Sequence, residues 1–213
     1  MITIHHLSTS RSERIVWLAE ELGLEYRIEW HQREPTGAAP AAMREVHPIG
    51  KAPIIRDGDM VLAESGAIVE YLVRRYGKGR LAPGPQAPEY PQYLYWLHFA
   101  EGSFMTLMLI ALVLSRVPEA KGSPVQERIG KRVQQMLGFV DSALGEREFF
   151  AGSEFTAADV MMVFPFTTMR RFLDYDRTPY TNVAAYMQRI EARPAYRRAM
   201  ERAGADAGGW KAA

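Results

Sequence analysis

The sequence predicts an α+β domain followed by an all-helical domain. Short β-type and helix-type runs alternate over the first 77 residues in the order βαβαββα, whereas the apolar pattern after a glycine- and proline-rich stretch is helical throughout. We therefore place the first domain at residues 1–77, a linker at 78–89 and the helical domain at 90–213.

The first strands are marked by apolar residues that alternate with polar ones. Ile2 and Ile4 form one such run, and Tyr26, Ile28 and Trp30 form another. The segment between them has helical spacing and ends at a glycine, which favours a helix C-terminus; its residues are Ile15, Leu18, Ala19, Leu22 and Gly23. Two strands joined through a helix predict a parallel, right-handed βαβ unit.

The rest of this domain predicts a hairpin between two helices. A short helix is expected around residues 40–46, and β-rich runs flank the turn dipeptide Asp57-Gly58. Ser65 can cap a final helix that ends at Gly77. Adding an antiparallel hairpin to the βαβ unit gives a mixed four-stranded sheet.

The remainder of the chain predicts helices. Residues 83–88 contain four glycines or prolines, as a linker should. The helices are expected at residues 90–116, 124–144, 156–172, 182–193 and, as a short piece, from Pro194. Pro165 is expected to kink the third helix, because proline lacks a backbone N–H. The last residues either fray or dock through Trp210.

Composition excludes several functions. Twenty-six basic and 25 acidic residues give a net charge of +1, so nucleic acid is not expected as a partner. The longest apolar run, 104–114, is shorter than the ~20 residues of a membrane span, and no secretory signal is visible, so we expect a cytoplasmic protein without a membrane partner. The chain has no cysteine, which excludes a protein thiol, and its five histidines lack ligand spacing, so no metal is expected.

Four stretches of the chain resemble the cytosolic glutathione transferase superfamily: STSRSERIVWLAEELGLEY, HPIGKAPII, LAESGAIVEYL and EFTAADVMM. The resemblance covers nearly the whole chain, and YWLHFAEGSFMTLML is similar to a bacterial and fungal branch. It implies a thioredoxin-like first domain that binds glutathione as co-substrate, without a resident cofactor. It also implies a homodimer formed through the helix of residues 65–76 and the first long helix of the second domain.

Hydroxyl side chains crowd the turn between the first strand and the first helix. A helix N-terminus favours an anion, so a thiol bound there would be acidified. The spacing back from Gly23 places Thr9 where, as the resemblance implies, the serine-type transferases carry their catalytic hydroxyl; threonine replaces serine here, and its extra methyl group restricts its rotamers. Ser10 is the second candidate, with a capping box to the acid three residues later as its structural alternative, and Ser8 is the third.

The resemblance also implies the remaining contacts of glutathione. Ala52-Pro53 would be a cis peptide whose first residue offers its backbone to the cysteinyl part; the alternative is a trans proline that opens an edge strand. Lys51 would reach the glycyl carboxylate or else remain solvated. Glu64 and Ser65 would hold the γ-glutamyl group, and an ordinary helix cap is their alternative.

Two further patterns lie in the helical domain. Met105 and Met108 are candidates for the pocket of the electrophilic substrate, with core packing as the alternative. Thr156 and Asp159 have the spacing of a capping box, which predicts a role in stability.

The predicted function is conjugation of the glutathione thiolate to small apolar electrophiles. Two alternatives stay open. Bound glutathione could instead reduce disulfides or peroxides without a protein cysteine. The fold could also serve a non-catalytic binding protein, because fold alone does not fix function.

Overall fold

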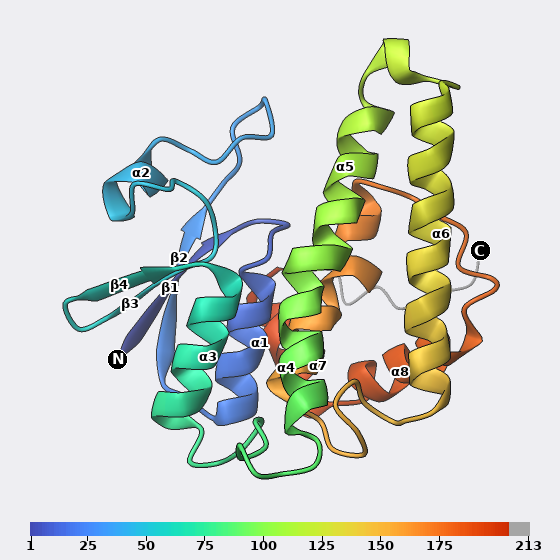
Figure 1. Ribbon diagram of the computed structural model, residues 1–213. Helices are drawn as coiled ribbons and strands as arrows, with labels where there is room; N and C mark the ends of the chain where they lie inside the picture. Colours follow the sequence, from blue (N-terminus) through green and yellow to red (C-terminus); the bar gives the residue numbers. More distant parts are fainter. Residues whose placement is uncertain (205–213) are drawn as a thin grey trace. The chain divides into compact units, whose positions relative to one another are not determined.

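The computed structural model describes residues 1–204 (Figure 1). The chain divides into two compact units. The first comprises residues 1–84 and the segment that begins at Glu191, and the second comprises residues 85–190. The predicted alternatives for Trp210 lie outside the described residues.

The first unit contains a mixed sheet of four strands in its described part, with the order β2-β1-β3-β4. Strand β2 is parallel to β1, whereas β1–β3 and β3–β4 are antiparallel pairs. The elements are β1 (Ile2–Leu7), α1 (Glu13–Leu22), β2 (Tyr26–His31), α2 (Ala42–Val46), β3 (Ile54–Asp57), β4 (Met60–Ala63) and α3 (Ser65–Tyr76). The predicted fold class and the βαβαββα order are confirmed.

Strand β1 is one of the two inner strands, and its side chains are covered on both faces of the sheet. All six of its residues are buried. Successive side chains of a strand point to opposite faces. His6 accordingly meets Ser12, at the start of α1, whereas Leu7 packs with Met43 of α2 and with Ile54. The two faces of β1 therefore carry different environments.

The second unit is built of helices. Its elements are α4 (Tyr90–Phe99), the π-helix η1 (Ala100–Met105), α5 (Thr106–Ser115), the 3₁₀ helix η2 (Pro118–Ala120), α6 (Pro124–Gly145), α7 (Ala157–Met162), the 3₁₀ helices η3 (Phe164–Phe166) and η4 (Thr168–Arg171), and α8 (Thr181–Glu191). The predicted helix 90–116 is thus interrupted by a π-helical stretch. There the Thr106 hydroxyl donates to the carbonyl of Glu101.

The prediction of one kinked helix over 156–172 is wrong. Helix α7 ends at Met162, and the chain continues through two short 3₁₀ helices. Pro165 lies in the first of these. Because proline cannot donate to the preceding turn, the α-helix stops there rather than bending.

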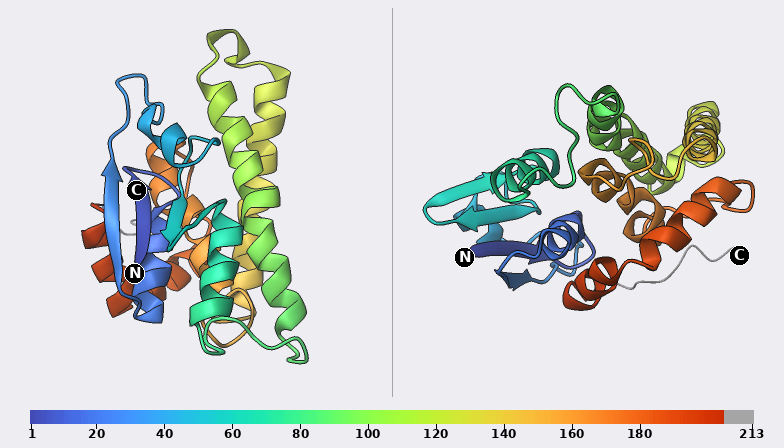
Figure 2. Two further views of the ribbon diagram at one scale, coloured as in Figure 1. Left: turned by 90° about the vertical axis from the view of Figure 1, so that its left-hand side faces the viewer. Right: turned by 90° about the horizontal axis from the view of Figure 1, so that it is seen from below.

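Helix α9 (Pro194–Arg202) belongs to the first unit, although its place in the sequence predicts that it lies in the helical domain 90–213. It lies beside α1, as the red and blue helices in Figure 2 show. This packing is hard to predict from sequence, because the acidic residues of α1 and the arginines that bind them lie at opposite ends of the chain.

Ion pairs hold α9 to α1. Glu20 binds Arg198 at 2.8 Å and Arg202 at 2.9 Å, and Glu21 binds Arg193 at 2.7 Å. The carboxylates are largely buried, with side-chain exposures of 10% and 8%, so these pairs are shielded more than surface pairs. The C-terminal helix is therefore an integral part of the first unit.

By length and composition alone, the segment Tyr90–Ser115 could cross a membrane; 33% of its most apolar window is buried inside the protein. The segment comprises α4, η1 and α5 of the second unit, and several of its large apolar side chains are exposed.

Candidate functional site

The sheet register brings the three predicted parts of the site to one end of the first unit. His5 pairs with Ile54, and Ile54 pairs with Ala63. Because these neighbouring strands are antiparallel, the hydroxyl turn after β1, the residues before β3 and the Glu64-Ser65 pair after β4 leave the sheet at the same end. A ligand at this end could contact all three segments.

The segment before β3 has the predicted backbone. The Ala52–Pro53 peptide bond is cis, the isomer that the resemblance implies. Ala52 is half-buried against the apolar cluster that contains Leu7 and Ile54, whereas Lys51 is exposed.

Glu64 has an unusual backbone conformation at the start of α3. Its φ is 77°, in a region that L-residues rarely adopt, and its side chain is exposed. Its carbonyl accepts from Ile68, while Ser65, 4% exposed, begins the helix. A 12-residue helix presents N–H groups at its first turn that suit a carboxylate, and backbone strain clusters at binding sites.

Thr9 also lies in the left-handed region, with φ 51°. Its hydroxyl donates to the carbonyl of Ser8 at 2.7 Å. The Arg33 guanidinium contacts this turn at three atoms. Its Nε lies 3.0 Å from the Ser8 carbonyl oxygen and 3.3 Å from the Thr9 hydroxyl oxygen, and its Nη2 donates to the Thr9 carbonyl at 2.9 Å. Arg33 therefore fixes the backbone of Thr9 and places a positive charge beside its hydroxyl.

Sequence reasoning missed Arg33. It lies in the loop after β2, and the parallel pairing of β1 and β2 carries that loop to the hydroxyl turn. The Ser8 N–H donates to the His31 carbonyl at 3.2 Å, and the Ser8 hydroxyl donates to Gln32 at 3.4 Å. Only the strand pairing reveals this neighbourhood.

A buried hydrogen-bond chain begins at His6. Its Nε2 lies 3.0 Å from the Ala203 carbonyl oxygen, which can only accept, so Nε2 carries a proton. Burial, the largest cause, lowers the pKa of His6 to about 4, so the ring is neutral at pH 7 and Nδ1 accepts. The donor to Nδ1 is the Ser12 hydroxyl, at 2.8 Å.

This chain decides what the Ser10 hydroxyl does. The oxygens of Ser10 and Ser12 are 2.7 Å apart. Because the Ser12 proton goes to His6, Ser10 is the donor of this bond. The Ser10 oxygen also accepts from the Ser12 N–H at 3.3 Å, so its backbone partner is two residues on, rather than three as in the proposed capping box. The Ser10 proton is thus already engaged.

The predicted residues of the helical unit have structural environments. Met105 and Met108 are 1% and 0% exposed, which favours core packing. The capping box of Thr156 and Asp159 is confirmed, and Asp159 also accepts from the Phe150 N–H and the Tyr186 hydroxyl. Burial outweighs these donors and raises the pKa of Asp159 to about 6.

Comparison with known proteins agrees with this fold. The family model described as "Glutathione S-transferase, N-terminal domain" matches residues 10–75, and "Glutathione S-transferase, C-terminal domain" matches residues 104–194. The chain belongs to the glutathione S-transferase family and is a transferase.

Individual relatives match over most of their length. The chain is 36% identical to Glutathione S-transferase 3 of Schizosaccharomyces pombe, over 95% of this chain and 88% of that protein. It is 29% identical to Glutathione S-transferase GstB of Escherichia coli, over 93% and 97% respectively. A solved glutathione S-transferase from Actinobacillus pleuropneumoniae superposes with a TM-score of 0.87 at 34% identity, covering 97% of this chain and 94% of that one.

Proposed function

We propose that the first unit binds glutathione at the end of the sheet where the three segments meet. Glu64 and Ser65 hold the γ-glutamyl group, the Ala52 backbone holds the cysteinyl part next to Pro53, and Lys51 reaches the glycyl carboxylate. The observation that carries this proposal is the register of β1, β3 and β4, which gathers the three segments. The helix N-terminus at Ser65 and the cationic Lys51 suit the two carboxylates of the ligand.

In this proposal Thr9 donates to the glutathione sulfur. Ser10 is the less suitable donor because its proton is engaged with Ser12. The Thr9 hydroxyl can leave the Ser8 carbonyl at low cost, since that carbonyl also accepts from Arg33. Arg33 then supports the thiolate through its charge, and Ser8 shapes the turn.

The reaction is a conjugation. The bound thiol loses its proton to solvent water, the sulfur forms a bond to an electrophilic carbon of a small apolar substrate, and the leaving group departs with the electrons of the bond that breaks. Positioning and thiol acidification supply the rate. The chemistry requires no resident cofactor, and we place the enzyme in the cytoplasm. A contribution of Met105 and Met108 to the electrophile pocket stays a prediction.

We further propose a homodimer. Large apolar side chains are exposed on α4, α5 and α6, among them Tyr95 at 46%, Val113 at 61% and Phe139 at 47%. Tyr95 and Phe139 belong to the lining of a groove of about 620 Å³. The other lining residues are Phe99, Ser103, Thr106, Leu107, Ile110, Arg132, Gln135 and Met136. A second copy of the chain would cover this surface.

Titration calorimetry with glutathione tests the proposed site. Ser65→Ala should weaken binding by about 5- to 150-fold, because a charged group loses a hydrogen bond worth ~1–3 kcal/mol. Ser142→Ala, an exposed serine of α6, is the matched control and should bind like the parent. An unchanged affinity in Ser65→Ala would contradict the assignment.

Substrate assays test the reaction class. Aromatic halides, peroxides and mixed disulfides are compared under the same conditions. Conjugation of the halides should be fastest. Preferential turnover of disulfides or peroxides would instead support the reductase alternative, and a protein that binds glutathione but turns over none of the three classes would be a non-catalytic relative.

A further inference from the structure

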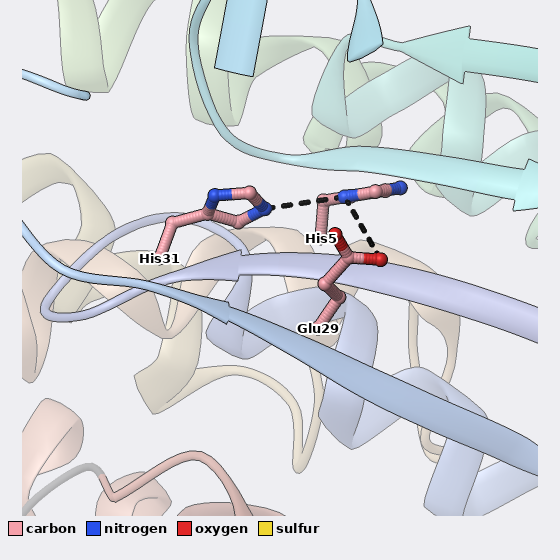
Figure 3. Close-up of side chains that lie close together, drawn as sticks. All are labelled: His5, Glu29 and His31. Atoms are coloured by element: carbon pink, nitrogen blue, oxygen red, sulfur yellow. Dashed lines mark hydrogen bonds and ion pairs between the residues drawn. The ribbon is translucent and has the colours of Figure 1, made fainter. Parts of the chain in front are cut away.

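Three potential metal ligands converge on one face of the sheet, on the adjacent strands β1 and β2. His5 pairs with Glu29 in the parallel register, and His31 follows two residues later on the same face. Figure 3 shows the two rings and the carboxylate pointing toward one another. The five histidines lack ligand spacing along the chain, so no metal site is expected from sequence; the register of two strands creates this cluster.

The distances fit a small cation. His5 Nδ1 lies 3.2 Å from His31 Nε2 and 3.8 Å from Glu29 Oε2, and the three ligand atoms all lie within 4.8 Å of one another. Ligands ~2.0–2.1 Å from a tetrahedral zinc ion are separated by roughly 3.3 Å. The two nitrogens already have this separation. The Glu29 side chain is 51% exposed, so its carboxylate can move the remaining distance.

The environment holds the two rings in place. His5 and His31 are 3% and 8% exposed. Within the described part of the chain, the buried Nε2 of His5 has no hydrogen-bond partner, so the ring orientation is set by the contacts of Nδ1 with His31 and Glu29. A metal ion can replace the proton in the hydrogen bond between these two buried imidazoles.

Nearby positive charges limit the affinity of this cluster for a cation. Arg27 and Arg56 act electrostatically on His5 and oppose a cation, whereas Glu29 attracts one. Arg27 is also engaged by the hydroxyl of Thr3 at 2.8 Å. A site with two imidazoles and one carboxylate matches zinc and other late transition metals better than calcium or magnesium, which prefer oxygen ligands.

We propose that His5, Glu29 and His31 form a binding site for a divalent transition metal ion, with zinc as the favoured ion and one coordination position left open. The site lies on the opposite face of β1 from His6 and the start of α1. It is independent of the proposed glutathione chemistry, so either proposal can fail without the other.

The test is a titration of tag-free, chelator-treated protein with Co²⁺, followed by displacement with Zn²⁺. Visible absorption of four-coordinate Co²⁺ should develop with one ion per chain and disappear when zinc is added. Glu29→Gln and His31→Gln are made as separate variants, and Glu29→Gln changes an exposed side chain. Each should weaken Co²⁺ binding by at least about 10-fold, which is the lower limit seen even for residues that only support metal ligands. His98→Gln, an exposed histidine on α4, is the control and should bind like the parent.

Circular dichroism melting of each variant establishes that it is folded. Failure of the parent to bind one equivalent of Co²⁺ would overturn the proposal. So would unchanged binding in both folded ligand variants, or an equal loss in His98→Gln, because the ion would then bind elsewhere on the surface. In those cases His5 and His31 are a hydrogen-bonded structural pair.

Discussion

Thr9 and Ser10 are adjacent hydroxyls with different freedom. Ser10 belongs to a buried chain that runs through Ser12 and His6 to the carbonyl of Ala203, at the end of α9. Thr9 instead bonds the neighbouring carbonyl, where Arg33 offers a substitute donor. The direction of the hydrogen bonds therefore distinguishes Thr9 from Ser10 as the donor to the glutathione sulfur, whereas sequence spacing makes both of them candidates.

Arg33 offers a first prediction. Replacing it with methionine keeps much of the stem but removes the charge and the donors beside Thr9, so the pKa of bound glutathione should rise by about one unit, or ~1.4 kcal/mol. Absorbance of the thiolate against pH measures this. Arg74→Met, an exposed residue of α3, should leave the value unchanged. Equal pKa values in Arg33→Met and the parent would show that Arg33 only supports the loop.

Helix α7 gives a pH dependence of stability. The pKa of Asp159 is raised by burial to about 6 from 3.8, so between these values the folded state holds a proton that the unfolded state has lost. Its contribution to stability is therefore fully present below about pH 4 and is lost as pH rises through 6, on the order of 3 kcal/mol in total. The difference in unfolding free energy between the parent and Asp159→Asn should fall over this range in urea titrations. A constant difference would mean that the donors to Asp159, which are the N–H and hydroxyl of Thr156, the Phe150 N–H and the Tyr186 hydroxyl, keep it ionised throughout.

Helix α9 can be tested through its most buried ion pair. Arg193→Ala removes the ion pair of Glu21, whose side chain is 8% exposed, and leaves in place the hydrogen bond that the Trp17 indole N–H donates to the same carboxylate. We expect a loss of ~1.5–3 kcal/mol, as for a hydrogen bond to a charged group. Arg197→Ala, which removes an exposed contact to the Glu191 carbonyl, should cost little. Similar urea midpoints for the two variants would contradict the role assigned to α9.

The assembly state follows from the exposed apolar surface of the second unit. Light scattering should give about twice the chain mass of 24.1 kDa. Phe139→Glu places a charge in the groove and should shift the protein toward monomer, whereas Gln134→Glu makes an acidic change elsewhere on the same helix and should not. A parent that is monomeric at micromolar concentration would refute the dimer.

Much of the architecture was accessible from sequence because its signals are local. The two-residue turn after Asp57, the glycine at the end of α1 and the capping box of α7 each depend on neighbouring residues, and each is present. The break at Pro165 was underestimated, since a single sequence does not reveal whether a proline bends a helix or ends it.

The features that sequence did not reveal depend on contacts between distant segments. Arg33 reaches Thr9 only through the pairing of β1 and β2, and His6 meets Ala203 only because α9 returns to the first unit. The His5 cluster likewise exists only in the folded sheet. Periodicity predicts which elements form, whereas strand register and tertiary packing decide which side chains meet.

The central claim is that Thr9 stabilises the glutathione thiolate while Ser10 holds the turn. Ultraviolet absorbance of the bound thiolate, followed against pH in Thr9→Val and Ser10→Ala, tests it most directly. Thr9→Val keeps the shape but removes the donor, so the pKa of bound glutathione should rise by about one to two units, the equivalent of ~1.5–3 kcal/mol. Ser10→Ala should keep the thiolate and lose mainly stability, ~0.5–1.5 kcal/mol for the hydrogen bond to Ser12. Loss of the thiolate in Ser10→Ala with its retention in Thr9→Val would reverse the assignment, and retention in both would contradict the hydroxyl mechanism itself.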